Sequence, residues 1–286
     1  MTSKETFRKR LDEITPSQLY LSSEKLKTIQ KNKTDLEPLP VKHISDKVIL
    51  LDGHHRAFTL FKRGVKTIEV YEDDDDLDWL EYLVCVDWCE DEGIRSIEDL
   101  ENRIVKEEDF DKLWLDRCSK MHDKVDDDLF QFVEFREEKD PELKSKICED
   151  ILHSLPDHFG IESTNKVYIH NVKNKYFVSV WVGRTVIGFT AVKEHNEFTS
   201  EIYVIGILEE FQGRGIGKKL IEKAEDNLRE KGKKYLTVKT LGPSHPDEGY
   251  EKTRSFYRSA GFVPLEEFIT LWDENNPCLY MVKSID

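Results

Sequence analysis

IYVIGILEEFQGRGIGKKLI, residues 202–221, is the stretch of sequence that decides the fold. It runs from an apolar segment, Ile202–Ile207, through three alternating glycines into a segment whose apolar residues have helical spacing. Glycine allows unusual backbone angles and the close approach of a ligand, while the first turn of a helix presents unpaired N–H groups and a partial positive charge. A strand, a glycine loop and a helix start therefore predict an anion site over Gln212–Gly217 that suits a pyrophosphate.

Positive side chains surround the glycine loop in a protein that is otherwise acidic. Arg214, Lys218 and Lys219 lie in or beside the loop, whereas the whole chain has a formal net charge of −15. The glycine spacing fits neither the dinucleotide-binding pattern G-x-G-x-x-G nor the phosphate-binding pattern G-x-x-x-x-G-K-S/T. The loop alone does not identify the anion, and a tight strand-to-helix turn without a ligand is the alternative.

Hydrophobic periodicity on both sides of the loop predicts an α/β (α+β) architecture. Short segments with alternating apolar residues predict strands, and segments with apolar residues three and four apart predict helices. The expected strands are Lys166–Asn171, Tyr176–Val182, Val186–Val192, Ile202–Ile207, Tyr235–Thr240, Phe262–Phe268 and Cys278–Val282, and the expected helices are Leu143–Leu155, Gly215–Lys231 and Tyr250–Ala260. Hairpins followed by a strand–helix–strand unit predict one mixed sheet with helices on its faces.

Two motifs in this half resemble those of the GNAT acetyltransferase superfamily. The loop QGRGIG, Gln212–Gly217, resembles the family's Q/R-x-x-G-x-G/A motif, and YRSAGF, Tyr257–Phe262, resembles its Tyr-x-x-x-Gly-Phe segment. The resemblance implies a mixed, mostly antiparallel sheet flanked by helices. It also implies an N-acetyltransferase that moves acetyl from acetyl-coenzyme A to a primary amine of a small molecule or a protein.

The resemblance assigns roles to particular residues. Tyr257 would protonate the departing thiolate, with a packing aromatic as the alternative role. Glu201 would accept the amine proton, although many relatives use no dedicated base and an edge charge is equally open. The residues that would contact coenzyme A are Val204, Ile205 and Ile207 beside the pantetheine, and Gln212, Gly213, Arg214, Gly215, Ile216, Gly217 and Lys218 around the pyrophosphate.

A second glycine turn lies in the N-terminal half, where DGHHR, Asp52–Arg56, follows the apolar segment Val48–Leu51 and opens a helix. The segment resembles the corresponding segment of the ParB/sulfiredoxin-like fold. Among proteins with that fold, it is most similar to the free-serine kinases. That resemblance implies a candidate site for ATP or ADP at Asp52, Gly53, His54, His55 and Arg56. A carboxylate base would also be required, and Glu24 is a candidate by its place after the first strand. The alternatives are a former nucleotide fold that now serves as a binding or dimer module, and a domain for protein or nucleic-acid recognition.

Composition limits the remaining choices. We predict two domains, 1–126 and 127–286, divided in a polar stretch that begins at Ser119. An acidic chain lacks the charge that nonspecific nucleic-acid binding needs, and no apolar run is long enough for a membrane helix. Five scattered cysteines predict reduced thiols without a metal site, so we expect a cytoplasmic protein. The oligomeric state stays open, a dimer included.

Overall fold

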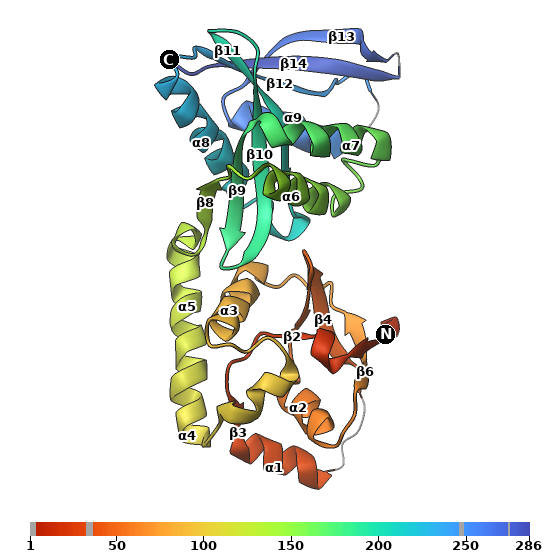
Figure 1. Cartoon of the computed structure of the whole chain (residues 1–286), viewed down its shortest axis with the longest axis vertical. Coiled ribbons are helices and arrows are strands. Elements are labelled where there is room, and N and C mark those ends of the chain that lie inside the picture. The colour runs from red at the N-terminus through yellow and green to blue at the C-terminus, as the bar shows by residue number, and fades with distance from the viewer. Residues whose placement is uncertain (1–3, 33–36, 246–248, 274) are drawn as a thin grey trace. The chain divides into compact units, whose positions relative to one another are not determined.

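The structure is a computed structural model that describes residues 4–32, 37–245, 249–273 and 275–286. The chain divides into two compact units: Met1–Glu134 with Val182–Thr185, and Phe135–Trp181 with Val186–Asp286 (Figure 1). The boundary predicted after residue 126 lies near the end of the last helix of the first unit. Within the described residues, no helix has the length and apolar character that a bilayer crossing requires.

The C-terminal unit is built on a seven-stranded sheet in the order β13-β14-β12-β11-β10-β9-β8. β11 pairs parallel with β12, whereas the pairs β10–β11, β12–β14 and β13–β14 are antiparallel. The predicted mixed, mostly antiparallel sheet flanked by helices is therefore confirmed. The strands are β8 (Glu134–Glu137), β9 (Tyr176–Val182), β10 (Thr185–Glu194), β11 (Thr199–Ile207), β12 (Tyr235–Leu241), β13 (Val263–Asp273) and β14 (Asn276–Ser284).

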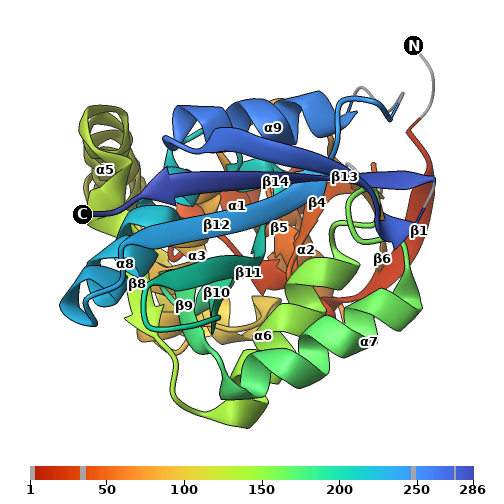
Figure 2. The same cartoon turned by 90° about the horizontal axis from the view of Figure 1, so that it is seen from above.

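Helices cover both faces of this sheet, with α6 (Pro141–His153) and α7 (Glu162–Asn171) on one side and α9 (Gly249–Ser259) on the other (Figure 2). Ile221, Ala224 and Leu228 of α8 (Ile216–Glu230) share a buried cluster with Ile202 of β11 and Tyr257 of α9, so α8 packs on the same face as α9. Burial of such an apolar helix face supplies most of the stability of a short helix.

Local sequence explains where α6 begins. Asp140 caps the helix, because its carboxylate accepts the N–H groups of Glu142 and Leu143. Pro141 occupies the first helical position, where its missing N–H costs nothing. Aspartate at the cap followed by proline is a start signal that can be read from the sequence.

The strand predicted over Lys166–Asn171 is wrong, because these residues belong to α7. The alternation that suggested a strand places Val167 on the surface, where its side chain is 53% exposed. Asn165 is buried instead, and its amide donates to the Phe159 carbonyl at 2.7 Å. A hydrogen-bonded polar residue thus lies on the inward side of this helix, and a search for alternating apolar residues does not reveal it.

The N-terminal unit has a five-stranded mixed sheet in the order β1-β6-β4-β5-β2. Its strands are β1 (Thr6–Arg10), β2 (Thr15–Pro16), β4 (Leu39–Ile44), β5 (Lys47–Leu50) and β6 (Thr67–Glu72), and a separate pair joins β3 (Leu21–Ser22) to β7 (Ile104–Val105). The helices are α1 (Ser23–Asn32), α2 (His54–Lys62), α3 (Trp79–Asp91), α4 (Glu107–Phe110) and α5 (Asp116–Asp127). A ParB/sulfiredoxin-like identity for this unit stays a prediction.

Short 3-10 and π-helical turns complete both units. They are Leu11–Glu13, Ile97–Arg103, Asp111–Leu115, Leu129–Phe132, Val172–Asn174 and Glu209–Phe211, of which Asp111–Leu115 is the π-helical one.

Candidate functional site

The glycine loop of the C-terminal unit is shaped by two different demands on glycine. Gly215 caps α8 with a φ of +83°, a backbone angle that side chains disfavour. Gly217 is needed for space, because an added Cβ would lie 2.8 Å from the Phe256 ring and 3.2 Å from Ile207. The start of α8 can therefore approach both β11 and α9 closely.

The loop is tied to the end of β11 by Gln212, whose side-chain amide donates to the Ile207 carbonyl at 2.9 Å. The first N–H groups of a helix have no partners within the helix, so those at the start of α8 can bind an anion held in the loop. Lys218 is exposed in the first turn of α8 and adds positive charge there. This arrangement suits the predicted pyrophosphate.

β11 and β12 separate partway along their length. Their parallel ladder joins Thr199–Ile202 to Tyr235–Val238, and within the described residues it ends there. Beyond Ile202, a register shift at the β10–β11 pairing skips Tyr203, and β11 stays paired with β10 up to Ile207. The edge of β11 that faces β12 over Val204–Ile207 is therefore available to a ligand, beside the residues predicted to contact pantetheine.

Thr240 lies on β12 beyond the point of separation, and its hydroxyl is buried without a hydrogen-bond partner among the described residues. A buried polar group without a partner is costly, and a ligand with amide groups between the strands could supply one. The open strand edge, the unpartnered hydroxyl and the helix start together fit a pantetheine chain that ends in a pyrophosphate.

Glu201, the predicted base, is buried in the β11 strand with its side chain 6% exposed. Lys239 of β12 donates to both carboxylate oxygens at 3.1 and 3.2 Å, and His195 lies 2.6 Å from one of them. Charge-assisted contacts of this kind fix the position of the carboxylate. Sequence reasoning missed Lys239 and His195, because neither lies at a motif spacing from Glu201.

Tyr257, the predicted acid, packs in the core with 5% of its surface exposed. Its ring lies between those of Phe256 and Phe262, at centroid distances of 5.1 and 5.8 Å. Burial, with smaller contributions from Tyr168 and Tyr250, raises the pKa of the Tyr257 phenol well above its usual value. The hydroxyl stays protonated at neutral pH, as a proton donor must.

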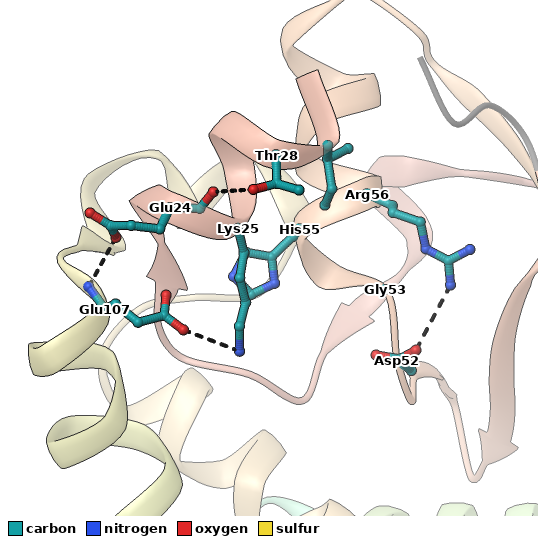
Figure 3. Close-up of a pocket in the computed structure, with 9 residues that line it drawn as sticks. Glu24, Lys25, Thr28, Asp52, Gly53, His55, Arg56 and Glu107 are labelled. Atoms are coloured by element: carbon teal, nitrogen blue, oxygen red, sulfur yellow. Dashed lines mark hydrogen bonds and ion pairs between the residues drawn. The ribbon is translucent and has the colours of Figure 1, made fainter. Parts of the chain in front are cut away.

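The N-terminal unit contains a pocket of about 510 Å³ that brings together Glu24 and most of the DGHHR segment (Figure 3). Gly53 caps α2 with a φ of +82°, so the start of this helix faces the pocket. Arg56 lies 3.8 Å from Asp52 on one side. Five of the six residues predicted for nucleotide binding line the pocket: Glu24, Asp52, Gly53, His55 and Arg56.

The opposite side of the pocket is organised by Glu107, which sequence reasoning missed. Its backbone N–H donates to the Glu24 carboxylate at 2.9 Å, and its own carboxylate lies 3.8 Å from the Lys25 ammonium (Figure 3). Its carboxylate also accepts the Ser22 hydroxyl. Glu107 is 83 residues from Glu24, so only the fold brings the two together.

The two histidines of this segment lie in different surroundings. His54 is buried outside the pocket, and its Nε2 accepts the Ser17 N–H at 3.0 Å. Burial lowers the pKa of His54 to about 3. His55 lines the pocket and accepts the Ser22 N–H at 2.9 Å, and burial together with Lys25 lowers its pKa to about 4. Both rings are neutral acceptors at neutral pH.

Neutral buried histidines predict acid sensitivity. In the unfolded chain histidine has a pKa of about 6.5. Below that pH the histidine of the unfolded state becomes protonated, whereas His54 of the folded state stays neutral. The free energy of unfolding should therefore fall as pH drops from about 6.5 toward about 3, by roughly 2 kcal/mol at pH 5 from His54. Urea titrations at pH 7 and pH 5 should show that the free energy of unfolding falls less in His54→Gln than in the wild type. An equal fall in the two proteins would show that His54 is not the cause of the acid sensitivity.

Comparison with known proteins assigns a family to most of the C-terminal unit. Residues 132–262 match the model of the Acetyltransferase (GNAT) family. These residues therefore form a GNAT acetyltransferase domain, as the two motifs predicted.

Individual relatives match only part of the chain, and the chain spans between 14% and 52% of the length of the curated ones. A mycothiol acetyltransferase of Corynebacterium glutamicum is 31% identical over 81 residues, which cover 28% of this chain and 28% of that protein. An uncharacterized N-acetyltransferase of Chlorobaculum tepidum is 41% identical over 92 residues, or 32% of this chain and 52% of that protein. A solved putative acetyltransferase of the GNAT family from Desulfovibrio desulfuricans aligns with 54% of this chain and 99% of its own, at 18% identity and a TM-score of 0.48.

Proposed function

We propose that this protein transfers acetyl from acetyl-coenzyme A to a primary amine, through the domain that we place after residue 126. The observation that carries the proposal is the separation of β11 from β12 beyond Ile202, on the part of β11 that leads into the glycine loop. It offers an open strand edge for the pantetheine chain and a helix start for the pyrophosphate in one continuous path. Acetyl-coenzyme A supplies an activated acyl group when bound.

The chain's own residues support each part of this transfer. N–H groups of β11 beyond Ile202 can hold the thioester carbonyl oxygen. Glu201, or His195 hydrogen-bonded to it, takes the proton from the amine. Tyr257 gives a proton to the thiolate, because its phenol is kept protonated by burial. Proton removal and proton delivery are thus both assigned to side chains of this domain.

Calorimetric titration with acetyl-coenzyme A, followed by an assay of coenzyme A release with a panel of primary amines, tests the proposal. Binding at micromolar concentrations with amine-dependent release is the expected result. Absence of binding would sink the proposed function, while binding without release on any amine would restrict the domain to a binding role.

The pocket of the N-terminal unit supports a second candidate function, binding of the phosphates of ATP or ADP and phosphoryl transfer to a small hydroxylated molecule. The observation that favours it is the convergence of Glu24, Asp52 and Arg56 on one pocket at the start of α2. Arg56 and the N–H groups of α2 would bind phosphate, and the carboxylate of Glu24 would accept the hydroxyl proton. Glu107 would hold Glu24 in place through its backbone N–H.

Replacement of Arg56 by alanine is expected to abolish the thermal stabilisation of the protein by ATP or ADP, because the pocket loses its guanidinium partner for phosphate. Arg8→Ala is the matched control, since Arg8 belongs to β1 and its side chain is 72% exposed. Melting temperatures measured with and without nucleotide decide the question. A shift of equal size in both variants would place any nucleotide site elsewhere.

A further inference from the structure

Several positive side chains gather around Glu201, on one face of the sheet where β11 and β12 are still paired. Lys193 stands directly opposite Glu201 in the β10–β11 ladder, and such partners share a face. Lys239 donates to the same carboxylate. Lys175 approaches from the start of β9, with its ammonium 4.3 Å from the centroid of the Tyr203 ring.

Two of these lysines have no carboxylate partner. Within the part of the chain that the structure describes, neither Lys175 nor Lys193 forms a salt bridge, because Glu201 is already paired with Lys239. Lys175 is half-buried, and burial together with the charge of Lys193 lowers the pKa of its ammonium. An anion near both would relieve their repulsion.

The position of Lys175 is fixed by the fold. The ammonium of Lys144, a buried residue of α6, donates to the Lys175 carbonyl at 2.8 Å. The aromatic ring of Tyr203 beside Lys175 is held in turn, since its hydroxyl accepts the Asn171 amide at 3.0 Å. The main chain of Lys175 and the ring that its ammonium contacts are thus both held in place, which reduces the freedom that the side chain loses when it binds a ligand.

This cluster lies at the acetyl end of the proposed cofactor path. The pyrophosphate site is at the start of α8, beyond Ile207, so a pantetheine along β11 points its far end toward Val204 and Glu201. The incoming amine must reach that end. It meets there a group of cations, although the chain as a whole has a net charge of −15.

We propose that the amine acceptor carries an anionic group, a carboxylate or a phosphate, which Lys175 and Lys193 bind while its amine is acetylated beside Glu201. This inference rests on the proposed acetyl transfer and narrows its substrate class to amino acids and amine phosphates.

Two matched pairs of probes test the inference on the full chain saturated with coenzyme A: β-alanine against propylamine, and phosphoethanolamine against ethanolamine. Calorimetry is expected to show about tenfold tighter binding of the anionic member in at least one pair, with the advantage reduced by added salt. The pair with the larger advantage distinguishes carboxylate from phosphate. Lack of coenzyme A binding, seen before any probe is added, would instead be a failure of the proposed function.

Three variants complete the test. Lys193→Gln, an exposed position on β10, and Lys175→Gln should each remove most of the anionic advantage without weakening the neutral probes. Lys166→Gln is the control, since Lys166 pairs with Glu162 on α7 and its side chain is 72% exposed. Equal binding of charged and neutral members, no binding of either anionic probe, or an advantage that survives in Lys193→Gln would each overturn the inference.

Discussion

Replacement of Gly215 by glutamate is expected to weaken acetyl-coenzyme A binding by about 100-fold or more, a loss of roughly 2.7 kcal/mol. Gly215 begins α8 with a φ of +83°. The new carboxylate would stand where the pyrophosphate is proposed to bind, and it would interact with the same helix N–H groups. Electrostatic repulsion and occupation of the site act in the same direction, so the effect should be large.

The control for this variant lies at the other end of the same helix. Gly232 follows α8 with a φ of +72°, and an added Cβ there meets nothing within 4 Å. Gly232→Glu therefore imposes a similar backbone strain and the same charge, far from the loop. Calorimetry should show near-normal binding of acetyl-coenzyme A by Gly232→Glu. Equal weakening in both variants would mean that strain, and not the anion site, causes the loss.

Prediction from sequence succeeded where chemistry depends on adjacent residues. The strand at Tyr176–Val182 was predicted with the bounds the structure shows, because its aromatic and β-branched residues favour a strand. The glycine loop was readable because Gly215 and Gly217 act through the backbone next to them. These features are local, and so their sequence signals are local as well.

Features that depend on distant partners could not be predicted. The end of the β11–β12 ladder at Ile202 depends on how two strands more than thirty residues apart pair with each other. The pairing of Glu201 with Lys239 joins two strands across a separation of 38 residues. Glu107 likewise lines the N-terminal pocket from the start of α4, and no sequence motif links it to Glu24. A sequence motif can thus predict a glycine loop at the start of a helix, whereas side chains brought together from distant parts of the chain appear only in the fold.

Replacement of Tyr257 by phenylalanine is expected to lower kcat for acetyl transfer by about 100-fold or more, within the range of a lost general acid, with KM nearly unchanged. The ring keeps its contacts with Phe256 and Phe262, so the variant should fold normally. Only the proton for the departing thiolate is removed. Because burial raises the pKa of this phenol, activity of the wild type should persist through the mildly alkaline range where an ordinary tyrosine begins to ionise.

Tyr176→Phe is the matched control, because Tyr176 packs partly buried against the same hydrophobic cluster. Burial also raises the pKa of Tyr176, to about 12, so the two hydroxyls differ chiefly in position. Steady-state assays of coenzyme A release should therefore separate them. Unchanged kcat in Tyr257→Phe would assign Tyr257 to the core alone, and the thiolate would then take its proton from solvent. A drop in kcat confined to Tyr257→Phe, at unchanged melting temperature, would assign the proton donor to Tyr257, near the end of α9.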